Sequence, residues 1–340
     1  MKRLLERLLG RGEPALSAKS LPTVDVPTLV LREGATFPIV EWSALDAHAP
    51  VSDDPKVLDV FWTAVAAAWL DKLRQTLGGH YRVVESEHFL LLSALDARPA
   101  KVLMDFAEKT HRRILSLLDG ITRNTENGKV CILVFRDNDT YYQYVSNYYP
   151  DEGEFAQSGG MFLQHGYGHF VFTEGDMFQM EPTIAHELTH CLMQHLPIPA
   201  WLNEGIAVNA ERRVCVVGAP LETPEELHRM HLDFWNESTI QEFWSGKSWQ
   251  RAGDSNKLSY DLATRFVQLA SGDRDRFCAF ANAADSVDGG ASAAIANLGY
   301  PVAHLADAVL GEGEWSPKPE AWVDGIEHGQ FNKVCLLTSI

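Results

Sequence analysis

The 340-residue chain lacks several patterns that would place it in other classes of protein. It has no apolar run of about 20 residues, the length needed to cross a bilayer, so no transmembrane segment is expected. Residues 1–10 alternate leucines with charged side chains and lack the unbroken apolar core of a signal peptide. We expect them to form a short amphipathic helix packed on the protein itself. Internal repeats and low-complexity segments are also absent from the sequence.

Cysteine is scarce, and basic residues are outnumbered by acidic ones. The five cysteines are widely spaced, odd in number and form no C-x-x-C pair, which argues against a disulfide framework. This usage favours a reducing compartment, here the cytoplasm. The net charge of -17 argues against nucleic acid and anionic membrane surfaces as partners. A hydrophobic content of 46% with 22% charged residues is typical of a globular protein.

A metal-binding pattern stands out near the middle of the chain. His186 and His190 are four residues apart, a spacing that puts both imidazoles on one face of a helix. Two nitrogens placed in this way can bind one Zn²⁺ ion. Glu187 follows the first histidine and is positioned to act as a general base without binding the metal. A catalytic zinc site needs a third protein ligand, which must come from elsewhere in the chain.

Glu204, which lies 14 residues after His190, is the candidate third ligand. Pro197 and Pro199 stand between them and are expected to end the first helix and start a second. Residues 201–213 have apolar side chains at helical spacing and predict that second helix. A tight corner between the two helices would bring Glu204 opposite the histidines. The sequence therefore predicts a His₂Glu zinc site.

The H-E-x-x-H pattern at 186–190 and the W-L-N-E-G block at 201–205 resemble those of the gluzincin metallopeptidases. The short spacing between the two motifs is more similar to the bacterial peptidase MA-like proteins. This resemblance covers residues 158–211 and implies a zincin-like fold, Zn²⁺ as cofactor, and a peptide or protein substrate. The G-x-M-E-N signature of the aminopeptidases is absent, so endopeptidase activity is expected rather than aminopeptidase activity.

Two further residues are candidates for supporting roles. The reaction needs a hydrogen-bond donor for the oxyanion, and Tyr260 is proposed for it by analogy with the downstream tyrosine or histidine of those peptidases. The alternative is that Tyr260 packs at the start of a helix, and His228 and His231 are weaker rivals. Glu211 lies two helical turns after Glu204 and is expected to orient His190 through a hydrogen bond. The competing interpretation is a solvated glutamate at the end of a helix.

The expected fold class is α+β and zincin-like. A small mixed sheet with an edge hairpin is expected over the H-E-x-x-H helix, followed by a mostly helical C-terminal part. The predicted divisions are an irregular and helical segment at 1–79, a metallopeptidase domain at 80–310 and a tail at 311–340. Within the sheet, residues 81–94 and 130–135 predict strands, and the second is apolar throughout and therefore expected to be central.

The hairpin is predicted from Met161–Leu163 and His169–Thr173, with a turn between them. Peptide substrates are expected to bind in extended form alongside the second of these strands. His165 and His169 are interpreted as hairpin or surface residues, and His195 is expected to face away from the metal ligands. Residues 139–149 predict a short helix whose tyrosines pack in the core rather than line a substrate site. A closing strand is expected at 333–338.

The leading functional hypothesis is zinc-dependent hydrolysis of peptide bonds. An alternative from a different class is a metal-binding scaffold that recognises a partner without turnover. Hydrolysis of a non-peptide amide would use the same residues, and the sequence does not separate it from peptide hydrolysis.

Overall fold

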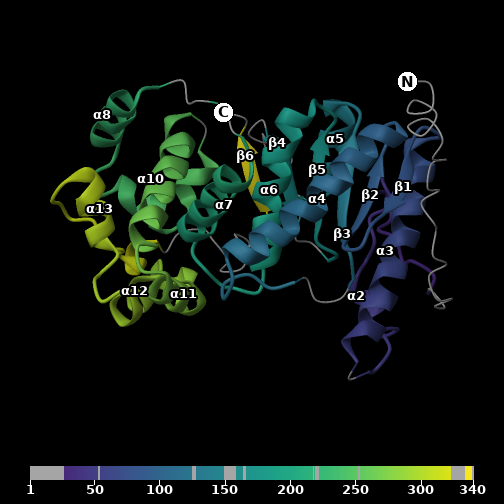
Figure 1. The fold of residues 1–340 in the computed structure, drawn as a ribbon, viewed down its shortest axis with the longest axis horizontal. Coiled ribbons are helices and arrows are strands. Elements are labelled where there is room, and N and C mark those ends of the chain that lie inside the picture. The colour runs from purple at the N-terminus through teal and green to yellow at the C-terminus, as the bar shows by residue number, and fades with distance from the viewer. Residues whose placement is uncertain are drawn as a thin grey trace, which may run out of the picture.

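The structure, a computed structural model, describes residues 27–52, 54–124, 128–148, 158–163, 166–216, 218, 222–251, 253–322 and 334–338. The helix expected at residues 1–10 lies outside the described residues. The described part of the chain is an α+β protein with a sheet at one end and a helical part at the other (Figure 1). None of its helices is both long enough and apolar enough to span a membrane.

The sheet is mixed and has six strands in the order β1-β2-β3-β5-β4-β6. The strands are β1 (Arg82–Glu85), β2 (Phe89–Ser93), β3 (Val130–Phe135), β4 (Ser158–Leu163), β5 (His169–Thr173) and β6 (Val334–Thr338). Strand β3 is fully buried and pairs in parallel with β2 and β5, which confirms the predicted central strand. The remaining pairs, β1 with β2, β4 with β5 and β4 with β6, are antiparallel.

The single strand predicted at residues 81–94 is instead a hairpin of β1 and β2. Between the two strands, the N–H of Ser86 donates to the carbonyl of Phe89 at 2.9 Å and closes a turn. The polar run Ser86–His88 interrupts the apolar pattern at this point, and this interruption was the available signal for two strands. The error was therefore one of continuity and not of secondary-structure type.

The hairpin of β4 and β5 is present, but it does not form the edge of the sheet as predicted. Strand β6, from the far C-terminus, pairs with the outer side of β4, so β4 is an inner strand. Strand β5 is hydrogen-bonded on both sides, to β3 and to β4. The prediction that a substrate adds alongside β5 is therefore wrong, because β5 has no free backbone edge. The closing strand expected at 333–338 is confirmed as β6.

Helices cover both faces of the sheet, and the alternation of side chains along the strands separates two cores. Leu90 and Leu133 face α3 and α5, where Trp69 and Tyr144 are buried. Leu91, Ile132 and Phe172 are among the residues facing α4 and α6. Burial of the tyrosines at positions 141 and 144 confirms that they pack in the core. The N-cap of this tyrosine helix is Asp137, not Asp139 as its predicted start implied.

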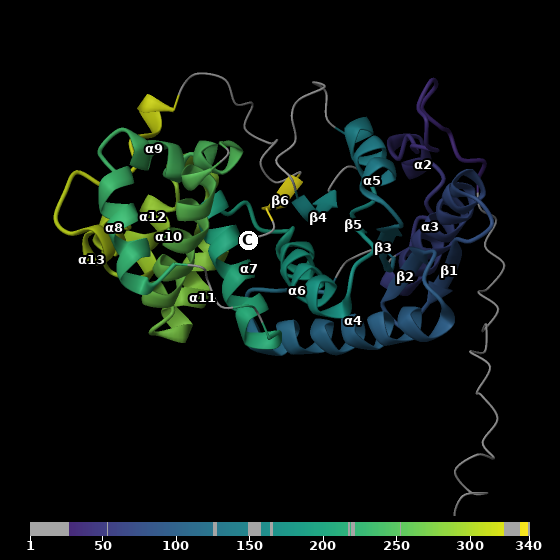
Figure 2. The same ribbon diagram turned by 90° about the horizontal axis from the view of Figure 1, so that it is seen from above.

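The other elements are mostly helices, and those after β5 build the second half of the molecule (Figure 2). The α-helices are α2 (Ser43–Asp46), α3 (Pro55–Leu77), α4 (Ala97–Leu117), α5 (Asn138–Val145), α6 (Met177–Met193), α7 (Ala200–Val214), α8 (Pro224–Phe234), α9 (Thr239–Trp244), α10 (Asp254–Ala270), α11 (Arg274–Ala283), α12 (Ala291–Asn297) and α13 (Ala303–Leu310). Short 3₁₀ turns are η1 (Ser146–Tyr148), η2 (Lys247–Gln250), η3 (Ser286–Asp288) and η4 (Pro319–Ala321).

Helices α6 and α7 form the corner between the two halves. Helix α6 ends at Met193, and Pro199 is the N-cap of α7, as the two prolines predicted. Helix α6 lies directly against β4: a Cβ atom on Gly160 would come within 2.5 Å of the Thr183 side chain. On the opposite side of the corner, α7 packs closely against α10. A Cβ atom on Gly205 would come within 2.5 Å of the carbonyl oxygen of Ala263. The corner is therefore held between the sheet and α10.

Candidate metal centre

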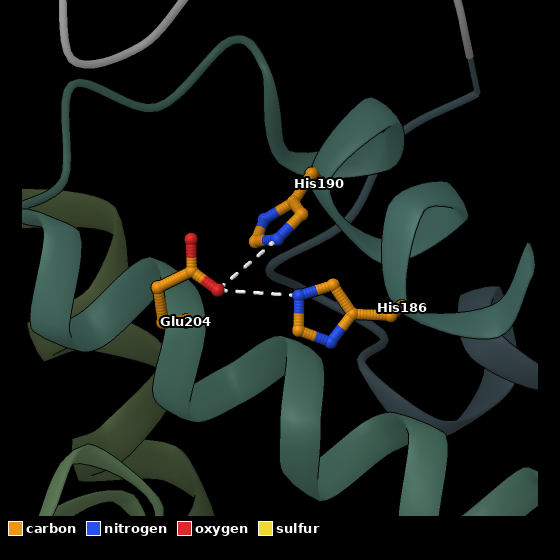
Figure 3. Close-up of side chains that lie close together, drawn as sticks. All are labelled: His186, His190 and Glu204. Carbon is orange, nitrogen blue, oxygen red and sulfur yellow. Dashed lines mark hydrogen bonds and ion pairs between the residues drawn. The ribbon is translucent and has the colours of Figure 1, made fainter. Parts of the chain in front are cut away.

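The three predicted metal ligands come together at the α6–α7 corner (Figure 3). Helix α6 supplies His186 and His190 one turn apart, with their ring centroids 4.7 Å from each other. Helix α7 supplies Glu204 from the facing side. Its Oε2 atom lies 3.2 Å from Nε2 of His186 and 3.5 Å from Nε2 of His190. One potential ligand atom from each residue lies within 4.8 Å of the other two, a spacing that a single metal ion can bridge.

Burying these three polar side chains lowers the stability of the folded protein unless a cation binds to them. His186 is fully buried, and His190 and Glu204 are 4% and 6% exposed. Nε2 of His190 is a buried polar atom with no hydrogen-bond partner in the described part of the chain. An unpartnered polar atom in a protein interior is destabilising unless something else satisfies it. The donor set of two imidazoles and one carboxylate matches what zinc uses in catalytic sites, so these residues fit a zinc ion.

The far side of each histidine ring has its own partner. Nδ1 of His186 lies 3.2 Å from Oε2 of Glu211, and Nδ1 of His190 lies 3.0 Å from Oδ1 of Asn203. The prediction that Glu211 orients His190 is therefore wrong, because Glu211 contacts His186. Asn203 precedes Glu204 on α7 and points to the neighbouring histidine, so His190 is oriented by an amide. Such contacts fix the ring orientation of metal-binding histidines.

The charges in the group are strongly coupled. Burial disfavours the charged form of His186, but its hydrogen bonds to Glu204 and Glu211 outweigh this and raise its pKa to about 10. Burial also disfavours ionisation of Glu204, yet His190 and His186 hold the pKa of that carboxyl well below its usual range. The pocket therefore stabilises a carboxylate that needs a positive partner, which a metal ion can supply in place of a proton.

Glu187 is 1% exposed, and neither of its carboxylate oxygens has a hydrogen-bond partner among the described residues. Burial raises its pKa to about 7, against the opposing effects of His186 and His190. The backbone N–H of Phe162 on β4 also favours the charged form, without reaching standard hydrogen-bond geometry. A carboxylate with a pKa near neutrality is suited to accepting and returning a proton.

Tyr260, on α10, lies beside the metal group. Its ring centroid is 6.4 Å from that of His186, and the residue is 7% exposed. The rival candidates lie elsewhere. His231 is fully buried in a network with Asp261 and Trp235, and His228 is exposed on α8. Of the three candidates for the oxyanion donor, the structure therefore brings only Tyr260 to the site.

The other histidines of this region lie apart from the metal ligands. His169 lies in β5, so its interpretation as a hairpin residue is confirmed, but it is fully buried, with Nε2 2.8 Å from the Tyr144 hydroxyl, and is not a surface residue. It belongs to the core on the far face of the sheet, and its place in an apolar strand was the signal for this. His195 is exposed and follows the end of α6. His165 lies outside the described residues.

Some residues of the W-L-N-E-G block pack in the core, and others contact the histidines of the candidate site. Trp201 is fully buried, and its Nε1–H donates to the carbonyl of Gly289 at 3.0 Å. Leu202 is also fully buried, in the core of the helical half. Gly205 permits the close contact with α10, the helix that carries Tyr260. Three of the five residues thus pack the corner, while Asn203 and Glu204 reach the histidines.

A second group of side chains with the spacing of metal ligands lies where β2 and α4 meet. It is formed by Glu87, His88 and Glu108. The Glu108 carboxylate accepts hydrogen bonds from the hydroxyl of Ser86 and from the backbone N–H of His88, and it lies 2.8 Å from Nδ1 of the same histidine. The ring of His111 packs on His88 with centroids 4.4 Å apart. His111 is 2% exposed, and its Nδ1 has no partner in the described ranges.

Comparison with known proteins finds no matching family model and no matching curated protein.

Proposed function

We propose that this protein is a zincin-like, gluzincin-type peptidase that uses zinc to hydrolyse bonds within peptide chains. The observation that carries the proposal is the buried His186, His190 and Glu204 group, with the unpartnered carboxylate of Glu187 beside it. A site built only to hold a metal does not need a second buried carboxylate without hydrogen bonds. Such a group is costly to bury and is typical of catalytic positions.

A zinc ion held by these three residues would supply Lewis acidity, polarising a peptide carbonyl and lowering the pKa of water to about 7. Glu187 takes a proton from the attacking water and passes it to the leaving nitrogen. Burial raises the pKa of the Glu187 carboxyl above its ordinary value, which favours proton uptake by this group. The hydroxyl of Tyr260 donates a hydrogen bond to the oxyanion that develops at the carbonyl. Glu211 and Asn203 hold the two histidine rings in place.

The substrate edge is proposed to be the outer side of β4, which the terminal strand β6 occupies in the structure, and not β5, which lies between β3 and β4. Helix α6 packs directly on β4, and the backbone of Phe162 on β4 lies near Glu187. An extended peptide that pairs with this strand would gain main-chain hydrogen bonds while its scissile bond lies beside the metal group. The four cysteines in the described ranges are free, in keeping with the reducing cytoplasm as the proposed location.

Cleavage of a defined peptide mixture tests this proposal. The purified protein, loaded with zinc, is incubated with the mixture, and the products are identified by mass spectrometry. We expect internal cleavages that stop when a chelator removes the metal and resume when zinc is restored. The His190→Ala variant serves as a matched control and should be inactive. Absence of cleavage by the zinc-loaded protein, or equal cleavage by His190→Ala, would overturn the proposal.

A further inference from the structure

The C-terminal strand β6 occupies the outer edge of β4 along most of its length. The register pairs Leu163 with Val334, Phe162 with Cys335 and Met161 with Leu336. Both views of the fold show β6 beside β4 at the end of the sheet that faces α6 and α7 (Figures 1 and 2). A segment more than 170 residues after β4 in sequence thus adds a strand beside the proposed metal site.

Strand β4 is the part of the sheet closest to the proposed chemistry. Gly160 touches Thr183, which lies one turn before His186 on α6. Phe162 contributes its backbone N–H to the surroundings of Glu187, and it is the residue that pairs with Cys335. The backbone of β6 therefore runs along the edge where a substrate peptide has to lie.

We propose that β6 is an intramolecular inhibitor that occupies the substrate-binding edge of β4 and must leave before a peptide can bind. This inference rests on the proposed function, because it assigns β6 to the substrate position of that site. The occupant is the segment Val334–Thr338, and the ligand that displaces it is an extended peptide. The sequence of the segment, V-C-L-L-T, has no proline or charged residue and can form the same main-chain ladder as a substrate.

A tethered strand of this length suits a reversible role. Only five residues pair with β4, and a short edge strand has modest stability of its own. Its attachment to the chain gives it an effective concentration in the millimolar range. A peptide substrate therefore competes with a weak occupant that is always present. The consequence is an increased apparent KM for peptides with no change in kcat.

The test weakens the strand in the full-length protein with Leu336→Pro, because proline cannot donate to a strand ladder. Ser339→Pro, beyond the end of β6, is the matched control. We expect the KM for a cleavable peptide to fall about 10-fold in Leu336→Pro, with kcat and zinc content unchanged, and no change in Ser339→Pro. Adding a synthetic peptide of residues 333–340 should inhibit Leu336→Pro competitively, whereas a scrambled peptide of the same composition should not.

A binding measurement separates this inference from the proposed function. In proteins that also carry Glu187→Gln, a fluorescent extended peptide should bind about 10-fold more tightly when Leu336→Pro is present. Tighter binding without hydrolysis by any variant would support the inhibitory strand and refute the peptidase. Hydrolysis with the same KM and peptide affinity in both proteins would overturn the inhibitory strand alone. If Leu336→Pro does not fold, the assay uses the protein with an unaltered β6. The synthetic peptide of residues 333–340 is then tested for its ability to displace the fluorescent peptide from that protein. Failure to compete there would also overturn the inference.

Discussion

Two groups of histidine and glutamate side chains in this protein have similar composition but opposite degrees of hydrogen bonding. In the group around Glu108, the carboxylate is satisfied by Ser86 and His88 from the protein itself. In the group around Glu204, Nε2 of His190 and both oxygens of the adjacent Glu187 have no hydrogen-bond partner in the described chain. The two groups also differ in burial, since the members of the first are half-buried or exposed.

This difference separates a structural cluster from a site that needs a ligand. Glu108 receives so many hydrogen bonds that, despite the opposing effect of burial, its pKa falls below the usual value. A metal ion would have to replace those bonds. At the α6–α7 corner, a metal would instead bind Nε2 of His190, which has no hydrogen bond and only a 3.5 Å contact with Glu204, and it would neutralise the buried Glu204 carboxylate. Within the two ligand sets themselves, only the α6–α7 corner has a buried ligand atom without a hydrogen bond in the described chain, Nε2 of His190, whereas the unpartnered Nδ1 of His111 lies beside the second set and is not part of it. This difference supports the corner as the candidate metal centre.

The largest expected effect is the loss of bound zinc when a histidine of the α6–α7 corner is replaced, with no loss when a histidine of the second group is replaced. The protein should contain close to one zinc per chain, and His190→Ala should abolish this, because two ligands do not hold a tetrahedral site. The matched change in the other group, His88→Ala, should leave the zinc content unaltered. Elemental analysis of the three purified proteins measures both outcomes. Equal zinc content in His190→Ala and the wild type would remove the distinction between the groups.

A smaller effect is expected from the residues that orient the ligands. Asn203→Ala and Glu211→Ala should each weaken zinc affinity by about 10- to 100-fold, because each removes a contact that fixes a histidine ring. Glu87→Gln, in the second group, is the control and should not change the affinity. Competition titration with a chromophoric chelator gives the affinities. Wild-type affinity in both corner variants would show that these contacts do not support the site.

The smallest expected effect is on the pH dependence of the free energy of unfolding, and it arises from His111, beside the second group. Burial, followed by the nearby His88, lowers the pKa of His111 to about 4. Its unfolded-state pKa is about 6.5, so the unfolded chain takes up the proton first and stability falls as pH decreases from 6.5 towards 4. His111→Phe should remove about 1 kcal/mol of the stability lost between pH 7.5 and 5.5. Urea unfolding at the two pH values measures this, and an unchanged pH dependence would contradict it.

The sequence predicted those parts of the molecule that depend on local patterns. The central strand β3 follows from its apolar run, and the α6–α7 corner follows from two prolines and helical spacing. The convergence of His186, His190 and Glu204 follows from the same corner. These features involve neighbouring elements, so their geometry is set within a short stretch of chain.

Predictions that depended on distant contacts were less successful. The position of β6 on β4 joins segments far apart in the chain, so nothing local to residues 158–173 shows that the hairpin has another neighbour. Glu211 was predicted to contact His190, and no role was predicted for Asn203. Which histidine each residue contacts depends on how α7 is rotated against α6, and spacing alone does not determine this. The burial of His169 depends on α3 and α5, which cover one face of the sheet and supply Trp69 and Tyr144.

The Glu187→Gln substitution tests the central claim most directly. The amide has nearly the size of the carboxylate and leaves His186 and His190 in place, so zinc should remain at close to one ion per chain. It cannot accept a proton from the attacking water, and general acid–base catalysis contributes about 10² to 10⁴ in rate. Zinc content and peptide cleavage are therefore measured on the same preparation. We predict retained zinc with cleavage reduced at least about 100-fold. Cleavage at the wild-type rate by a zinc-loaded Glu187→Gln protein would contradict the proposed mechanism.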